Sequence, residues 1–315
     1  MPLSQVRLHI HEVCVRDGFQ IEPLFVPTDR KVELINTLSR TGLSKIEVTS
    51  FSSPKAIPAL ADAEEVMGRI DRIPGVEYAA LVPNVRGAQR ALACDVDELN
   101  LVMSASPSHN LANLRMDRQQ SLAQFADIVA VAADRVQINA SLSTAFGCPF
   151  DGEVPIEQVL DLVQHFVDLG IRRVALCDTT GMANPAQVRR LFGAVIARWP
   201  QVAFTAHFHD TRAMGLANAL AAFDVGVVRF DASLGGLGGC PFAPGASGNV
   251  CTEDLVHMFE AMGENTGVDL EHLLTLARAL PGIVGHAVPG QVMKAGPATR
   301  RYPKSDAVVA AVPGR

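Results

Sequence analysis

The sequence lacks paired cysteines, long apolar runs and a signal-like N-terminus, and each absence argues against one class of protein. Six cysteines are scattered through 315 residues without a CxxC pair, which does not suggest a disulfide framework or a structural zinc site. No apolar run approaches the ~20 residues that span a membrane. The N-terminus lacks the basic-then-apolar build of a secretory signal. We therefore expect no membrane partner and a reducing, cytoplasmic setting.

Positive charge is also in short supply. The net charge is −6 at pH 7, and no block of five or more basic residues occurs. Neither observation gives a reason to expect nucleic acid as a partner. Hydrophobic residues make up 48% of the chain and charged residues 19%, which is enough to bury one barrel core or two small domains.

The sequence contains one repeated pattern, in which short β-rich runs alternate with helical stretches. The expected strands are residues 7–13, 45–50, 77–82, 98–103, 136–143, 172–178, 202–209 and 226–233. The clearest amphipathic segments between them are residues 29–42, 117–135, 155–170 and 212–226. Asp29 is placed to cap the first of these helices, and left-handed glycines are expected at helix ends, at Gly42, Gly170 and Gly226.

Eight strands, each followed by a helix, is the count of a (β/α)8 TIM barrel in the α/β class. A doubly wound sheet shares the alternation, but no GxGxxG follows the first strand and no P-loop is present. Residues 1–295 are therefore expected to form a single barrel domain, with the barrel at about 7–250 and extra helices at about 251–295. Residues 296–315 have Pro, Gly and charge without a clear period, and we expect a mobile tail.

Barrels of this kind collect functional residues at the C-terminal ends of the strands and in the loops that follow them. Polar residues cluster at those places in this sequence. They are Arg16 and Asp17 after the first strand, Glu47 in the second, Asp178 at the end of the sixth, His207 and His209 at the end of the seventh, and Asn249 after the eighth.

The two histidines in 205-TAHFHD-210 raise the possibility of a metal. Residues i and i+2 of a strand share one face, so His207 and His209 would both point into the mouth of the barrel. A structural alternative is that both are partly buried and hydrogen-bonded to the backbone. Together with Asp17 and Asn249 they form a mixed nitrogen and oxygen set. Such a set suits octahedral Mg²⁺ or Mn²⁺ better than a closed thiolate zinc site.

The glycine-rich loop 235-GGLGGCPFAPGASGN-249 also allows two interpretations. It is either a flexible connector or a lid that closes over a substrate and brings the Cys240 thiol inward. A thiol near a divalent cation has a lowered pKa and can transfer protons. The loop is not a Walker motif, because it lacks GK[ST].

These motifs resemble those of the 3-hydroxy-3-methylglutaryl-CoA (HMG-CoA) lyases, in the aldolase-type metallolyase group of TIM barrels. The resemblance runs in order from near residue 8 to about residue 280. Its most specific features are the GGLGGCP loop together with HxHDT, because the related isopropylmalate and homocitrate synthases usually lack that cysteine loop. The matching stretches are 15-VRDGFQ-20, 42-GLSKIEVTSFSSPK-55, 83-PNVRG-87, 147-GCPFDG-152, 178-DTTG-181, 207-HFHDT-211 and 235-GGLGGCPFAPGASGNVCTEDLV-256.

The resemblance implies a role for each matching residue. It assigns the metal to Asp17, His207, His209 and Asn249, with His207 also shuttling a proton. It assigns to Arg16 the stabilisation of the thioester carbonyl and its enolate, with Gln20 as a polar neighbour. Glu47 and Asp178 would support the site, and Cys240 would transfer a proton. Asn84 and Arg86, in the PNVRG motif, would contact CoA or substrate.

The implied reaction is the retro-Claisen cleavage of a 3-hydroxyacyl-CoA to acetyl-CoA and a keto acid, acetoacetate if HMG-CoA is the substrate. The implied cofactor is Mg²⁺ or Mn²⁺, and the implied partners are an acyl-CoA and a second copy of the chain in a homodimer. A base must take the hydroxyl proton, an electrophile must stabilise the oxyanion and a donor must quench the carbanion. A role in leucine degradation would follow from the HMG-CoA substrate.

Several departures from the family pattern keep the substrate open. Ser141 stands where a tyrosine is usual, Asn139 where an arginine is usual, and Ala175 where a serine is common. Citramalyl-CoA, cleaved to acetyl-CoA and pyruvate, is therefore an alternative substrate. A condensing acyltransferase is less favoured, since we expect it to need extra C-terminal regulatory sequence. A catalytically silent barrel would have lost at least one metal ligand or Arg16, and none is lost.

Overall fold

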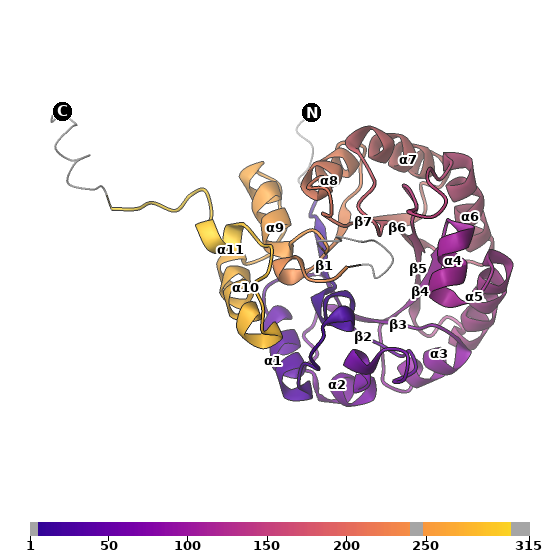
Figure 1. The fold of residues 1–315 in the computed structure, drawn as a ribbon, viewed down its shortest axis with the longest axis horizontal. Coiled ribbons are helices and arrows are strands. Elements are labelled where there is room, and N and C mark those ends of the chain that lie inside the picture. Colours follow the sequence, from indigo (N-terminus) through magenta and orange to yellow (C-terminus); the bar gives the residue numbers. More distant parts are fainter. Residues whose placement is uncertain (1–5, 240–247, 304–315) are drawn as a thin grey trace.

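The structure is a computed structural model that describes residues 6–239 and 248–303. Eight parallel strands form a closed barrel in sequential order, and β1 pairs with β8 to close it (Figure 1). The TIM-barrel prediction is thus confirmed. The strands are β1 (His9–Glu12), β2 (Lys45–Ser50), β3 (Glu77–Leu81), β4 (Glu98–Ser104), β5 (Gln137–Ser143), β6 (Arg173–Asp178), β7 (Ala203–Phe208) and β8 (Arg229–Ala232).

Helices surround the barrel and follow its strands in turn (Figure 1). They are α1 (Thr28–Leu38), α2 (Ala63–Arg69), α3 (Val85–Leu92), α4 (Pro107–Leu114), α5 (Arg118–Ala132), α6 (Ile156–Asp168), α7 (Pro185–Arg198) and α8 (Gly215–Asp224). Short helical turns are η1 (Cys14–Gly18), η2 (Phe19–Ile21), η3 (Pro58–Leu60) and η4 (Leu234–Gly236). Among the described residues, no helix is both long and apolar enough to cross a membrane.

The predicted C-terminal helices are present as α9 (Thr252–Ala261), α10 (Leu270–Val284) and α11 (Val292–Ala295). Helix α9 lies beside β1 and β8, where the barrel closes, and α10 and α11 pack against α9 (Figure 1). The expected tail is described only to residue 303, so residues 304–315 lie outside the described residues. Its mobility and the single-domain boundary at 295 stay predictions.

Helix ends agree with the sequence better than helix starts do. Gly42, Gly170 and Gly226 all have positive φ, at 91°, 85° and 101°, as expected for residues after helix ends. The capping role predicted for Asp29 is wrong. Helix α1 begins one residue earlier, and its N-cap Pro27 makes no side-chain cap bond. Asp29 lies inside the first turn and pairs with Arg69 of α2 instead, because a carboxylate one residue past the helix start points to solvent.

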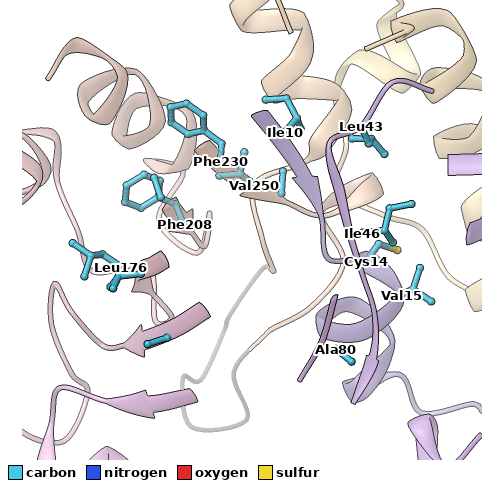
Figure 2. Close-up of a cluster of buried hydrophobic side chains, with 14 of the residues drawn as sticks. Ile10, Cys14, Val15, Leu43, Ile46, Ala80, Leu176, Phe208, Phe230 and Val250 are labelled. Atoms are coloured by element: carbon cyan, nitrogen blue, oxygen red, sulfur yellow. The ribbon is translucent and has the colours of Figure 1, made fainter. Parts of the chain in front are cut away.

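The strands present two different surfaces because successive side chains point to opposite faces. The outer layer, between strands and helices, is apolar: Phe230 of β8 contacts Phe259 of α9 with ring centroids 5.0 Å apart, and Figure 2 shows Phe208, Phe230 and Leu176 within this cluster. The barrel interior is polar. Its N-terminal end holds an ion network, in which Lys45 lies 2.6 Å from Glu98 and Arg173 lies 2.8 Å from the same carboxylate.

Candidate metal centre and active site

A single π-helical turn delivers two of the predicted site residues. The turn η1 follows β1 directly and holds Arg16 and Asp17, each only 7% exposed. π-Helical turns are rare in proteins, and those that occur are often found at functional sites. Gly18 at its end packs so closely that an added Cβ would lie 3.0 Å from the Leu237 side chain. The turn is therefore held rigidly against the loop that follows β8.

The structure brings Asp17, His207 and His209 together as predicted. One ligand atom from each lies within 4.8 Å of the other two, and all three residues are buried. The two imidazoles face each other through their Nε2 atoms at 3.3 Å, and His209 Nε2 lies 3.9 Å from Asp17 Oδ2. The i and i+2 spacing on β7 thus has the consequence expected from the alternation of a strand.

Asn249 joins this group through the backbone as well as its side chain. It forms an isolated antiparallel bridge with His209, and its Nδ2 donates to Asp17 Oδ2 at 2.7 Å and to the Leu237 carbonyl at 3.0 Å. Its buried Oδ1 atom has no hydrogen-bond partner among the described residues. Gly238 has a φ of 107°, and a Cβ there would lie 2.5 Å from Asn249 Nδ2, so this position requires glycine.

These four residues fit a divalent cation. Two ligands about 2.1 Å from one ion and at right angles to it lie about 3 Å apart, close to the 3.3 Å between the two Nε2 atoms. The unpartnered Oδ1 of Asn249 offers a neutral oxygen, and Asp17 offers an anionic one. Oxygen and imidazole donors of this kind are ligands for a divalent cation.

Burial and neighbouring charges shift the pKa values of Asp17 and His209. Burial alone would raise the pKa of Asp17, but the Arg16 guanidinium and both histidines outweigh it and lower that pKa. Burial and the neighbouring His207 lower the pKa of His209 to about 4. Asp17 is thus an anion and His209 a neutral imidazole near neutral pH, which are the forms that bind a metal.

Arg16 is held by carboxylates on two sides. Its Nε donates to Glu47 Oε2 at 2.6 Å, and its Nη1 donates to Asp17 Oδ1 at 2.7 Å. Gln20 Nε2 donates to the same Asp17 oxygen at 3.2 Å. Burial disfavours the guanidinium, but Glu47 and Asp17 raise its pKa above the usual value. A permanent cation is therefore fixed next to the candidate metal ligands.

Two residues that the sequence analysis missed lie directly behind the candidate metal ligands. Asp231 of β8 accepts from His207 Nδ1 at 3.2 Å and from His11 Nδ1 of β1 at 2.9 Å. Burial opposes its ionisation, but these two imidazoles lower its pKa. A carboxylate on Nδ1 leaves Nε2 of His207 aimed at the metal position, as metal-bound histidines generally require. The detectable signal was a polar residue at every second position of the first and last strands.

Other predicted site residues lie at positions with local structural roles. The buried Asp178 carboxylate accepts from the backbone N–H groups of Met182 and Ala183 at 2.8 and 3.0 Å, and burial raises its pKa to about 6. Asn84 caps α3 by accepting from Gly87 N at 2.9 Å. Arg86 is exposed on the same helix. Cys240 lies outside the described residues.

Comparison with known proteins places this geometry in one family. A model of the family described as HMGL-like matches residues 7–280. Hydroxymethylglutaryl-CoA lyase YngG of Bacillus subtilis is 47% identical over 90% of this chain and 96% of its own length. The (R)-citramalyl-CoA lyase of Chloroflexus aurantiacus is 40% identical over 91% and 94%. The structure of an HMG-CoA lyase from Acinetobacter baumannii, in complex with coenzyme A and 3-methylmalate, is 51% identical, with a TM-score of 0.93 over 97% of this chain and all of the other.

Proposed function

This chain belongs to the HMGL-like family, and from that membership and its active site we propose that it is a divalent-metal-dependent carbon–carbon lyase. It cleaves an HMG-CoA-like 3-hydroxyacyl-CoA to acetyl-CoA and a keto acid. The observation that supports this activity best is the sharing of Asp17. Its Oδ1 accepts from Arg16, and its Oδ2 faces His209 and Asn249, so a fixed cation and a metal position are adjacent.

The cleavage needs one proton removed and one returned. A base takes the proton of the 3-hydroxyl group, a carbonyl forms at that carbon, and the electron pair of the breaking C2–C3 bond passes to the thioester enolate. Arg16 is suited to stabilise the enolate oxygen, because its charge is permanent and already oriented by Glu47 and Asp17. Protonation of the enolate carbon then gives acetyl-CoA.

Asp17, His207, His209 and Asn249 would hold the metal. A divalent cation supplies Lewis acidity, which lowers the pKa of a hydroxyl group and stabilises negative charge on its oxygen. Family resemblance alone assigns to His207 the acceptance of the hydroxyl proton. Burial disfavours its charged form, but the Asp231 carboxylate behind it raises its pKa above the ordinary value.

Cys240 is assigned the return of the proton by family resemblance alone. A Cys240→Ser variant should keep the Mn²⁺ affinity of the wild type while turnover falls by orders of magnitude. Unchanged turnover would remove Cys240 from the mechanism. We also propose Mg²⁺ or Mn²⁺ as the ion, Asp178 as a support of the site, Asn84 and Arg86 as CoA or substrate contacts, a homodimer, a cytoplasmic location and a role in leucine degradation.

The acyl group is the open part of the assignment. Two relatives point to five-carbon hydroxy diacids, since one is named a citramalyl-CoA lyase and another was solved with 3-methylmalate. In this chain Asn139 and Ser141 replace larger family residues and bond to each other at 3.1 Å inside the barrel. Citramalyl-CoA, which would yield acetyl-CoA and pyruvate, is therefore the second candidate substrate.

Acetyl-CoA release should be measured with HMG-CoA and citramalyl-CoA side by side, with Mg²⁺, Mn²⁺ or a chelator. We expect cleavage of at least one of them that stops on chelation and returns with the metal. Fast cleavage of HMG-CoA identifies the six-carbon substrate, and cleavage of citramalyl-CoA alone identifies the five-carbon one. Absence of metal-dependent cleavage with both would overturn the proposed activity on these substrates.

A further inference from the structure

Arg16 has more hydrogen-bond donors than its two carboxylate partners use. A guanidinium has five N–H donors in a fixed fork, and Glu47 and Asp17 bond only Nε and Nη1. No acceptor in residues 6–239 and 248–303 bonds its Nη2 group. Where that group points is set by the two carboxylates. Asp17 lies on the same turn as Arg16, whereas Glu47 lies on β2. The orientation of Arg16 therefore depends on how the Glu47 side chain is itself held.

A chain of side-chain hydrogen bonds across the barrel interior holds Glu47. Its second oxygen, Oε1, accepts from Asn100 Nδ2 of β4 at 2.7 Å. Asn100 Oδ1 in turn accepts from Ser141 Oγ at 2.8 Å and from Asn139 Nδ2 at 2.9 Å, both on β5. All four residues are at most 8% exposed. The chain thus links β5, β4 and β2 to the turn that holds Arg16.

The direction of these bonds follows from chemistry. A carboxylate only accepts, so the amide N–H of Asn100 must face Glu47. The Asn100 oxygen then faces two donors from β5, and no donor is left opposite a donor. Each bond polarises the next toward Glu47, whose charge is matched by Arg16. A flipped Asn100 amide would place its oxygen against Glu47 Oε1 and its Nδ2 against Asn139 Nδ2, so the bond to the Glu47 carboxylate favours the orientation seen.

We propose that Asn100 and Ser141 are positioning residues for catalysis, which act through Glu47 to aim Arg16 at the thioester oxygen. This role rests on the proposed lyase activity but concerns residues that do not touch the candidate metal ligands. A purely structural role, in which the polar side chains only fill the barrel interior, is the competing explanation. The two explanations differ in what happens once Glu47 has been removed.

A double-mutant cycle separates them. Asn100→Ala should lower kcat about tenfold, with KM and Mn²⁺ affinity each changed less than about threefold. In a Glu47→Ala background the same change should have no further effect on kcat, since the path to Arg16 is already cut. As a matched control, Asn218→Ala removes another buried asparagine, whose side chain bonds the Ala183 carbonyl and no other group in the described part of the chain, and its effect should be the same in both backgrounds. If Asn100→Ala lowers kcat by the same factor in the Glu47→Ala background as in the wild type, the proposal is overturned.

A milder pair of variants covers the case in which Asn100→Ala fails to fold. Ser141→Ala removes one of the two donors to Asn100 and should lower kcat about threefold. Ser141→Thr keeps the hydroxyl and should restore the wild-type kcat. Equal activity of Ser141→Ala and the wild type would exclude Ser141 from the positioning chain, and equal loss in both variants would indicate packing instead.

A readout that needs no turnover keeps this inference apart from the proposed function. In protein labelled with ¹⁵N-arginine, the Arg16 Nε–H signal can be assigned by its loss in Arg16→Lys. Asn100→Ala should make exchange of this hydrogen at least about tenfold faster, while the guanidinium signals of Arg173 stay unchanged. Unchanged exchange at Arg16 would contradict the positioning role. If the wild type cleaves no acyl-CoA, the lyase proposal fails and the exchange result still decides the role of Asn100.

Discussion

The barrel interior and the outer layer are made from the same strands but differ in nearly every physical respect. In β8, Phe230 faces outward and contacts Phe259, whereas its neighbour Asp231 faces inward and bonds His11 and His207. TIM-barrel interiors are usually filled with branched apolar side chains. Here polar side chains occupy the interior, so hydrophobic stabilisation comes mainly from the outer layer. Along one strand, the outward-facing residues stabilise the fold and the inward-facing residues form the candidate site.

Buried carboxyl groups show the same difference. In the interior, Asp231 faces two imidazoles that lower its pKa, and Glu98 pairs with Lys45 and Arg173. In the outer layer, the donors to Glu12 and Glu253 among the described residues are all neutral groups. Burial therefore dominates and raises their pKa values to about 7 and about 8. Without a facing cation, burial therefore favours the neutral form of these two acids.

The largest effect is expected from the outer layer. Phe230→Ala removes a side chain that is 1% exposed and should lower the free energy of unfolding by about 3–5 kcal/mol. Mn²⁺ affinity of the folded protein should stay within about threefold of wild type, because the interior is not altered. Urea unfolding and calorimetric Mn²⁺ titration measure the two quantities. A large loss of metal affinity would show that the two surfaces of β8 are not independent.

His209→Ala should have the opposite effects, with a large loss of Mn²⁺ affinity and a small change in the free energy of unfolding. Removal of one candidate ligand should weaken Mn²⁺ binding by about 100- to 1000-fold, or about 3–4 kcal/mol. The metal-free protein should unfold within about 1 kcal/mol of wild type, since Nδ1 of the lost imidazole has no hydrogen-bond partner among the described residues. His9→Ala, at the opposite end of the barrel interior, is the control and should bind Mn²⁺ normally. Wild-type Mn²⁺ affinity in His209→Ala would exclude His209 as a ligand.

Asp231→Asn tests the layer of the interior behind the ligands. The amide keeps the shape of the carboxylate but no longer stabilises a proton on His207 Nδ1, so Nε2 is less available to a metal. We expect Mn²⁺ affinity to fall about 10- to 100-fold, as for other partners of metal-bound histidines. The test is the same calorimetric titration, performed beside His209→Ala. An Mn²⁺ affinity equal to wild type would mean that His207 is oriented by packing alone.

The sequence predicted the barrel and the residues at its mouth because both follow from local rules. A run of β-rich and helical segments sets the fold, and the i and i+2 spacing predicts that His207 and His209 share a face. Asp231, His11 and Asn100 were missed, since polar residues alternating along a strand resemble a solvent-exposed surface. Only closure of the barrel, which pairs His11 with Asp231 across β1 and β8, makes them interior. The sequence also could not show that the Asp178 carboxylate binds its own loop.

A pH-dependent effect is expected from a carboxyl group in the outer layer. Burial raises the pKa of Glu253 from 4.5 to about 8, so below pH 4.5 both the folded and the unfolded states hold its proton. Between pH 4.5 and 8 only the unfolded state releases it, and Glu253 makes stability fall as pH rises, by at most about 1.4 kcal/mol per pH unit.

Glu253→Gln cannot titrate, so it should lose this slope while the acceptor for Gly235 N is kept. The other titrating groups are common to both proteins. The difference in unfolding free energy, variant minus wild type, should therefore grow from pH 5 to pH 8 and then level off. Urea unfolding at each pH measures it. A difference that does not change with pH would mean that Glu253 is ionised in the folded protein, and a cation would then have to face this part of the outer layer.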